Sequence, residues 1–359
     1  MRRLTATVLG ALALAASAWA QSTITLVGAG ASFPFPLMAK YAEEYNRLTG
    51  GAVRINYQSI GSGAGVRQFF EQTIHFAGSD LPLNDQQLKD VKTRFNTNAL
   101  NIAYALGAIV PVYNLPGVRE TLRFTGPVLS DIFLGKIKTW NDPSLQSLNP
   151  NVRLPALPIT VVHRADSSGS TYVLSDFLSK VSSEWASKMG RNTTLPWPTG
   201  IGARGNEGVA GVVRQTPGAI GYVEVTYAIL NNLTYGAVQN KAGRFVRADL
   251  PSIKAAAFVP LPGDMRISLT HTDAPDGYPI TSFTYLILYE NLAANKAVKS
   301  EAEARALVEF IKWLLTDGQR FNEPLGYGAL NTVPQQRALA LLSRVTYGGT
   351  PIGKEIVGR

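Results

Sequence analysis

The 359-residue sequence contains no cysteine and only three histidines. Without thiols the chain forms no disulfide, no thiolate zinc site and no cysteine-bound iron–sulfur cluster. His75, His163 and His271 stand far apart and lack the His-x-x-x-His spacing of a helical zinc site. The sequence therefore predicts neither a metal nor a cofactor.

Long apolar runs are also missing, since no stretch approaches the ~18 uncharged residues that a membrane-spanning helix needs. Near the N-terminus, Arg2 and Arg3 precede a shorter apolar run, Val8 to Ala16, which is followed by Ala18-Trp19-Ala20. This pattern predicts a secretory signal peptide over residues 1–20. Because no cysteine follows the cleavage site, we expect a secreted, soluble chain that is not a lipoprotein.

Clusters of like charge are absent from the mature chain. The formal net charge is +9, and removing Arg2 and Arg3 with the signal peptide lowers it to +7. The remaining lysines and arginines are scattered, and no two of them are adjacent. Scattered charge is a poor footprint for nucleic acid, so we expect a solvated basic surface and no nucleic-acid partner.

Strand-like and helix-like stretches alternate along the chain, without an internal repeat or a Pro/Ser-rich linker. Residues 100–113 and 283–288 are almost wholly apolar, as in central strands that are covered on both faces. The alternation predicts an α/β fold with mainly parallel sheets, and the length suffices for two domains. Since no linker separates them, we expect the strands near 105–113 and 280–288 to cross between two lobes, with both termini in the first lobe.

Three small polar loops each lie between a predicted strand and a predicted helix: Gly30 to Phe33, Gly61 to Gly65, and Arg164 to Ser170. The first N–H groups of a helix are unpaired and carry partial positive charge, so such loops bind anions. Arg164 adds a planar, permanently charged fork. Serine and aspartate before a helix are also ordinary caps. Three such loops at one end of a parallel sheet favour an anion site.

A further stretch, residues 199–211, is rich in glycine and precedes a short predicted helix that contains Val209, Val212 and Val213. Its glycines indicate either a backbone that passes close to another group or a flexible loop.

Catalytic and nucleotide-binding motifs are incomplete. Ser62 and Ser168 stand at predicted helix starts, but neither lies in G-x-S-x-G or pairs with a lysine in S-x-x-K. A serine nucleophile also needs an adjacent base. Phe33 occupies the third glycine position of the G-x-G-x-x-G that begins at Gly28, and no P-loop occurs. A serine hydrolase stays open as the alternative to an anion-binding protein.

Five motifs together resemble the phosphate-binding proteins of the Pst phosphate ABC transporter. In chain order they are Gly28-Ala-Gly-Ala-Ser-Phe-Pro, Tyr57-Gln-Ser-Ile-Gly-Ser-Gly-Ala-Gly, Gly78-Ser-Asp80, Arg164-Ala-Asp-Ser-Ser-Gly-Ser170 and Gly218-Ala-Ile-Gly-Tyr-Val-Glu224. The resemblance covers nearly the whole mature chain. It implies a two-lobed, clamshell-like periplasmic binding protein in which each lobe has a mixed, mainly parallel sheet. Lobe I would comprise residues 21–107 and 281–359, and the inserted lobe II residues 108–280.

Carried over motif by motif, the resemblance implies a phosphate site between the lobes. Its predicted contacts are Ser32, Phe33, Ser62, Asp80, Arg164, Ser168, Gly169 and Ser170. Asp166 would support the site by pairing with Arg164. The sequence departs from the family pattern at Ser32 and Ser170, where threonine is common, and at Ser167, where glycine is. These changes keep the hydroxyls of the first and third loops.

The resemblance also accounts for a carboxylate, Asp80, in an anion site. Phosphate near neutral pH keeps a proton that it can donate to Asp80, whereas sulfate has none. A buried acceptor–acceptor contact costs ~1–3 kcal/mol, or more for charged groups. We therefore expect a monomeric, non-enzymatic protein that binds inorganic phosphate tightly, rejects sulfate, and delivers phosphate to the membrane permease subunits of an ABC transporter. The alternatives are a secreted phosphate-ester hydrolase that uses Ser62 or Ser168, and the same fold binding sulfate or molybdate.

Overall fold

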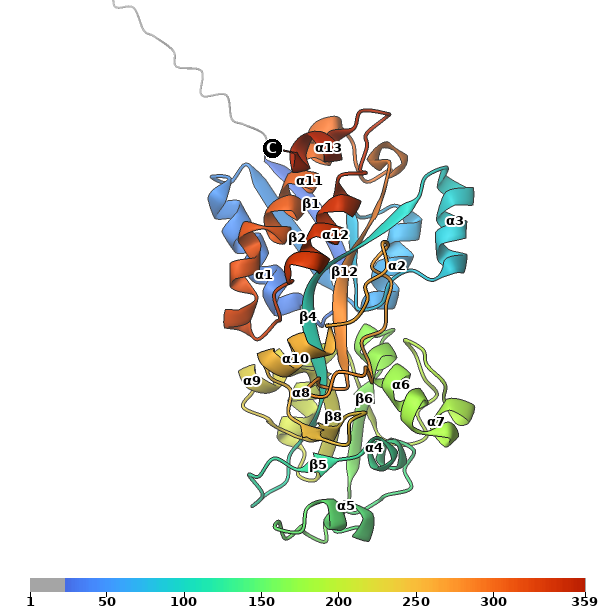
Figure 1. Cartoon of the computed structure of the whole chain (residues 1–359), viewed down its shortest axis with the longest axis vertical. Helices are drawn as coiled ribbons and strands as arrows, with labels where there is room; N and C mark the ends of the chain where they lie inside the picture. The colour runs from blue at the N-terminus through green and yellow to red at the C-terminus, as the bar shows by residue number, and fades with distance from the viewer. Residues whose placement is uncertain (1–22, 359) are drawn as a thin grey trace, which may run out of the picture.

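The computed structural model describes residues 23–358, so the predicted signal peptide lies outside the described residues. The chain forms two lobes, one above the other in Figure 1, with elements from both ends of the described chain in the upper lobe. The middle of the sequence, coloured green to yellow, builds the lower lobe. Among the described residues, no helix has both the length and the apolar character required to cross a membrane.

Both lobes combine strands with flanking helices, as the alternating sequence pattern predicts. The elements of the upper lobe are β1 (Ile24–Gly30), α1 (Phe35–Leu48), β2 (Val53–Ser59), α2 (Ser62–Glu71), β3 (Phe76–Ser79), α3 (Asp85–Phe95), α11 (Glu301–Leu315), α12 (Thr332–Leu342) and α13 (Ile352–Val357). Three short 3-10 helices, at Leu292–Ala294, Asp317–Phe321 and Glu323–Leu325, complete its C-terminal part.

The lower lobe holds the shorter elements. They are β5 (Arg123–Phe124), α4 (Gly126–Phe133), α5 (Pro143–Leu148), β6 (Thr160–Arg164), α6 (Gly169–Val181), α7 (Ser183–Lys188), β7 (Ile201–Ala203), α8 (Gly205–Gln215), β8 (Ala219–Glu224), α9 (Val225–Leu230), β9 (Thr234–Tyr235), β10 (Ala237–Gln239), β11 (Phe245–Val246) and α10 (Leu250–Ala256). Strands β11, β10 and β5 form a separate three-stranded sheet.

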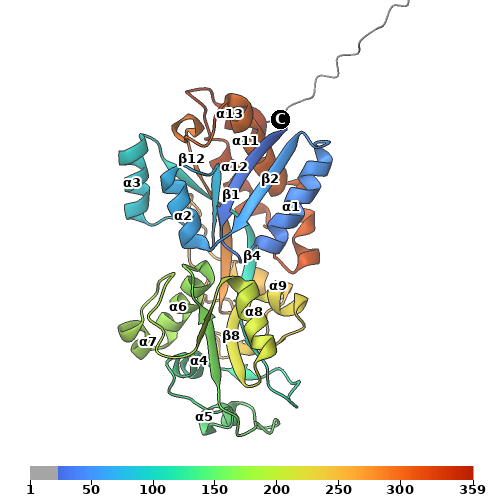
Figure 2. The ribbon, with the colours of Figure 1, turned by 180° about the vertical axis from the view of Figure 1, so that it is seen from behind.

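Two long strands, β4 (Ala99–Tyr113) and β12 (Thr281–Tyr289), connect the lobes (Figures 1 and 2). The large sheet has the order β2-β1-β3-β12-β4-β8-β6-β7, with β9 also beside β4. Strand β4 pairs antiparallel with β12 from Ala99 to Ala108 and with β8 from Ile109 onward. The pairs β1–β2, β1–β3, β6–β7 and β6–β8 are parallel. Nearly every residue of β4 and β12 is buried, as their apolar sequences predict.

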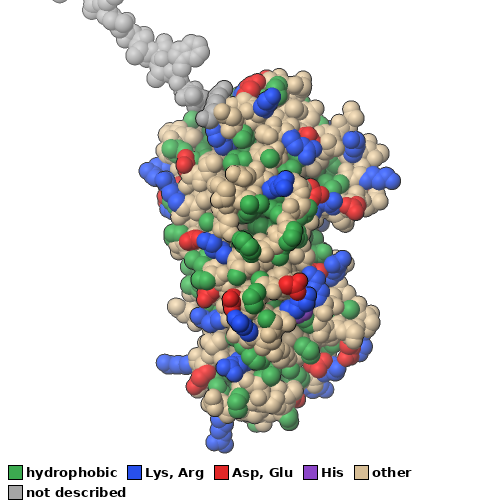
Figure 3. Space-filling view, viewed as in Figure 1, with side chains coloured by type: hydrophobic (Ala, Val, Ile, Leu, Met, Phe, Trp, Pro, Cys, Tyr) green, Lys and Arg blue, Asp and Glu red, His purple; other side chains and the backbone are tan. Residues whose placement is uncertain are grey.

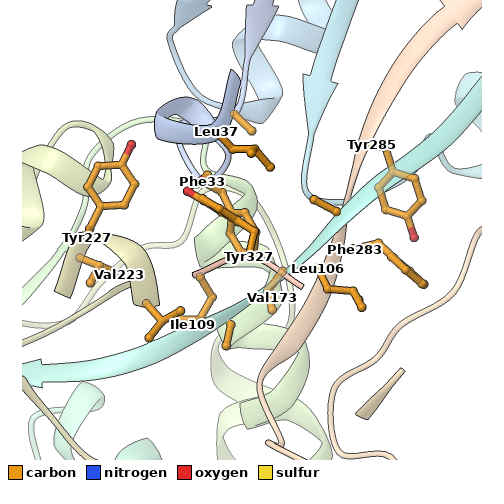
Figure 4. Close-up of a cluster of buried hydrophobic side chains, with 14 of the residues drawn as sticks. Phe33, Leu37, Leu106, Ile109, Val173, Val223, Tyr227, Phe283, Tyr285 and Tyr327 are labelled. Carbon is orange, nitrogen blue, oxygen red and sulfur yellow. Dashed lines mark hydrogen bonds between the residues drawn. The ribbon is translucent and has the colours of Figure 1, made fainter. Parts of the chain in front are cut away.

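Buried side chains from both lobes meet around the connecting strands (Figure 4). Leu106 and Ile109 of β4 lie in the same core cluster as Phe33 from the loop after β1, Val223 of β8 and Tyr327. Because this core includes Phe33, its packing holds the loop after β1 in place where that loop faces the other lobe.

Charged side chains are distributed over both lobes. On the face in Figure 3, Lys and Arg are interspersed with Asp and Glu, and no large area carries a single sign. This matches the scattered charge of the sequence.

Local signals predicted some elements better than others. The capping box of Asn84 and Gln87 is present at the start of α3. Helix α10 was not predicted, although Asp249 and Ser252 form a capping box there. Helix α8 begins at Gly205, four residues before the predicted apolar positions, so much of the glycine-rich stretch is helical.

Candidate functional site between the lobes

The loops at the carboxyl ends of β1, β2, β3 and β6 face one another where the two lobes meet. All eight residues predicted to contact the ligand are buried there. The structure brings them together through direct contacts between lobes, including a hydrogen bond from the Gly63 N–H to the Ser167 carbonyl at 3.0 Å. Loops distant in sequence thus form one site, as expected for the ends of parallel strands.

The loop after β1 is held rigidly by its neighbours. Gly30 has φ of +146°, and a Cβ there would lie 1.9 Å from the Gly78 carbonyl oxygen, so only glycine fits. Tyr227 donates its hydroxyl to the Ser32 carbonyl at 2.6 Å, and Tyr327 donates to the Phe33 carbonyl at 2.8 Å. The Phe33 ring is fully buried in the core.

Asp80, directly after β3, is a buried carboxylate surrounded by hydroxyls. Thr284 donates to its Oδ1 at 3.0 Å and Ser62 to its Oδ2 at 3.3 Å. Ser282 donates to its backbone carbonyl at 3.0 Å. No Lys or Arg of residues 23–358 forms an ion pair with Asp80. Burial raises the pKa of Asp80 to about 7, although the Thr284 hydroxyl and the charge of Arg164 oppose this shift.

Arg164, the last residue of β6, forms a two-point ion pair with Asp166. Its Nε donates to Oδ1 at 2.7 Å and its second terminal nitrogen donates to Oδ2. The Gly205 N–H adds a third bond to the carboxylate at 3.2 Å. Burial opposes the charge of Asp166, but its bonds with Arg164 outweigh burial and hold the pKa of Asp166 below its usual value. Arg164 is therefore oriented, and its charge largely balanced, within the lower lobe.

The loop after β6 is both a helix cap and part of the interface. Ser168 is the N-cap of α6, and its Oγ accepts the Thr171 N–H at 3.1 Å. Gly169 follows at the first helical position and lies against the upper lobe. A Cβ on Gly169 would be 2.3 Å from the Ser62 hydroxyl and 2.4 Å from Asp80 Oδ2. The first turn of α6 thus directly faces Ser62 and Asp80.

Two site residues were missed from the sequence. Asn206, in α8, is fully buried and hydrogen-bonds the side chains of Ser32 and Ser170. Its signal was weak, because it lies within a glycine-rich stretch of ambiguous structure. Thr284 orients Asp80 but sits in an apolar strand, where a single threonine is typical of β structure. The sequence signal for Thr284 was a polar residue within a mostly apolar strand that is fully buried.

Comparison with known proteins assigns the chain to a family. The PBP superfamily domain matches residues 15–318. The phosphate-binding protein PstS of Xylella fastidiosa (strain Temecula1) is 40% identical over 328 residues, which cover 90% of this chain and 86% of that protein. PstS of Pasteurella multocida is 41% identical over 308 residues, covering 84% and 85% of the two chains. The chain belongs to the PstS family of phosphate-binding proteins.

Solved structures support the fold of this PstS family member. A high-affinity periplasmic phosphate-binding protein, PfluDING, whose structure holds phosphate, matches with a TM-score of 0.70 and 20% identity, covering 91% of this chain and 97% of its own. A phosphate-binding protein from Stenotrophomonas maltophilia matches with a TM-score of 0.64 and 18% identity, covering 87% and 92% of the chains. The predicted family and the two-lobed α/β fold are confirmed.

Proposed function

We propose that this PstS family member binds inorganic phosphate between its lobes in the periplasm and delivers it to the permease subunits of an ABC transporter. Its relatives carry the name phosphate-binding protein PstS. The predicted signal peptide supports export to the periplasm. The proposed phosphate contacts are the eight predicted residues, with Asp166 holding Arg164.

The observation that carries this proposal is the contrast between donors and acceptor in the site. Hydroxyls of serines and the first turn of α6 surround the region where the lobes meet, and the Asp80 carboxylate there accepts only from the hydroxyls of Thr284 and Ser62 among the side chains of residues 23–358. Such a site suits a tetrahedral anion that accepts many hydrogen bonds and donates one. Phosphate near neutral pH has this character and sulfate does not. Complementarity therefore explains both binding and selection.

We propose the division of the chain into lobe I, residues 21–107 and 281–359, and lobe II, residues 108–280. The change of β4 partners supports it, because pairing passes from β12 to β8 between Ala108 and Ile109. Strand β12 begins at Thr281. Two strands that cross between lobes act as a hinge, and binding would be coupled to closure of the lobes.

We also propose that the protein is monomeric and not an enzyme. One observation keeps the phosphate-ester hydrolase open as a second candidate: the Ser62 hydroxyl lies 3.3 Å from a carboxylate oxygen of Asp80. The oxygen of Ser168, by contrast, caps α6. Turnover of a chromogenic phosphate ester that disappears in Ser62→Ala would support the hydrolase.

Calorimetry of the phosphate-free mature protein tests the proposal. We expect one phosphate or arsenate per chain, and an affinity for sulfate and molybdate lower by about 100-fold or more, because an unpaired buried acceptor costs about 3 kcal/mol. A phosphate assay on the protein as purified should detect a co-purified ligand. Equal affinity for sulfate and phosphate, or no phosphate binding, would contradict the proposal.

A further inference from the structure

Asn206 is a fully buried amide that contacts both lobes. It lies in the first turn of α8, in the lower lobe. Its backbone N–H donates to the Oγ of Ser32, from the upper lobe, at 3.1 Å. Its side-chain Nδ2 donates to the same Oγ at 2.9 Å and to the Oγ of Ser170 at 3.2 Å. Three of its hydrogen bonds thus end on two serines that are proposed phosphate contacts.

A serine hydroxyl can accept two hydrogen bonds and donate one. Both acceptor positions of the Ser32 oxygen are filled by Asn206. The Ser170 oxygen accepts the second hydrogen of Nδ2. Each hydroxyl then has its hydrogen left for another acceptor. Asn206 therefore leaves Ser32 only its hydrogen to donate, and it fills one of the two acceptor positions of Ser170.

The orientation of the amide is itself fixed. The Oδ1 of Asn206 accepts the Glu224 N–H at 2.9 Å, from the last residue of β8. If the amide were reversed, its NH₂ would face the Glu224 N–H, which places two donors together, and its oxygen would draw the serine hydrogens toward itself. The network therefore requires an asparagine with Nδ2 toward the serines.

We propose that Asn206 is a positioning residue for the anion: it holds Ser32 and Ser170 as donors to the bound oxyanion once the lobes meet. This inference rests on the proposed phosphate site. The donated hydrogens of Ser32 and Ser170 match unprotonated ligand oxygens, and Ser32 has no acceptor position left for a protonated one. The protonated oxygen of phosphate is then left to Asp80, the acceptor on the other side of the site. Asn206 acts through the serines and fixes the orientation of the ligand.

The test is a double-mutant cycle measured by phosphate titration of the full mature chain. Asn206→Ala should weaken phosphate binding about 10- to 100-fold, because the two hydroxyls lose their fixed direction. In a Ser32→Ala/Ser170→Ala background the same substitution should cost less than about threefold, since the groups that it orients are gone. Additive losses would show that Asn206 acts independently of the serines and would overturn the inference.

Asn206→Asp provides a second, independent measurement. Its carboxylate would accept the serine hydrogens and turn them away from the anion, so we expect weaker binding than in Asn206→Ala. Binding by Asn206→Asp as tight as wild type would overturn the inference.

Asn240→Ala is the matched control for damage to the fold. Asn240 is also a buried asparagine of the lower lobe, and it bonds the Pro275 and Gly277 carbonyls and the Ala242 and Arg244 N–H groups. Its loss should lower thermal stability and leave phosphate affinity unchanged. A wild-type chain that gives no phosphate isotherm would refute the proposed function itself; a normal wild-type isotherm with additive losses refutes only the role of Asn206.

Discussion

Asp80 and Asp166 lie on opposite sides of the same site with little exposure of their side chains, and their pKa values move in opposite directions. Asp166 has a two-point partner in Arg164, which outweighs burial and lowers its pKa. Asp80 has only neutral donors, so burial raises its pKa to about 7. The two carboxylates differ because Asp166 has the Arg164 guanidinium as an ion-pair partner, and Asp80 has no such partner among the described residues. The lower lobe carries a balanced ion pair, and the upper lobe carries a carboxylate that we propose as the acceptor for the ligand.

The largest effect is expected from removal of the cation. Arg164→Ala should weaken phosphate binding by about 100-fold or more, because it deletes charge-assisted donors and leaves Asp166 unpaired and negative in the site. Calorimetry measures the loss. Arg191→Ala is the control, since Arg191 pairs with Asp176 and its side chain is more than half exposed. An unchanged affinity in Arg164→Ala would exclude Arg164 as a ligand.

The close contact of Gly169, in the lower lobe, with Ser62 and Asp80, in the upper lobe, can be disrupted by a larger side chain. A methyl group in Gly169→Ala would overlap the Ser62 hydroxyl and Asp80 Oδ2, so the lobes could not approach as they do here. We expect about 10- to 100-fold weaker phosphate binding, equivalent to ~1.4–2.8 kcal/mol. Gly211→Ala is the matched control, because Gly211 lies in α8 with open space at its Cβ position. Comparable affinities in the two variants would contradict close packing at Gly169.

The loops of the site were predictable because each combines a strand end, small residues and a helix start. Arg164 to Ser170 and Gly61 to Gly65 have this local signature, which a single sequence displays directly. The partners that orient these loops were not predictable. Asn206 reaches Ser32 across 174 residues, and Thr284 reaches Asp80 across 204. Such contacts depend on how the strands assemble, and local spacing carries no record of it.

A moderate effect is expected when Asp80 loses its orienting donor. Thr284→Val removes the hydroxyl that stabilises the charged carboxylate and keeps the side-chain shape. The pKa of Asp80 should rise further, and phosphate binding near pH 7 should weaken about five- to tenfold. Affinity measured against pH checks both. Thr281→Val is the control on the same strand, since Thr281 is equally buried and its hydroxyl donates to the Tyr278 carbonyl. Identical pH profiles for the two variants would refute the role of Thr284.

The smallest effect concerns Glu224, a third buried carboxylate. Burial raises its pKa to about 8, so the folded chain keeps a proton that the unfolded chain releases. The contribution of protonated Glu224 to the free energy of unfolding is fully present at acid pH and is lost as the pH rises through about 8. The raised pKa of Asp80 likewise makes the folded state less stable as the pH rises, whereas the lowered pKa of Asp166 has the opposite effect. Glu224→Gln should reduce the fall in Tm between pH 6 and 9 by about 3 °C. Thermal melts that fall equally in both proteins would contradict this.

The central claim is that Asp80 selects phosphate by accepting its proton. Calorimetric titration of wild type and Asp80→Asn with phosphate and with sulfate tests it most directly. Asparagine has nearly the same shape but offers donors, so sulfate should gain affinity and phosphate should lose it. We predict that the ratio of phosphate to sulfate affinity falls at least tenfold in Asp80→Asn. An unchanged ratio would contradict the claim.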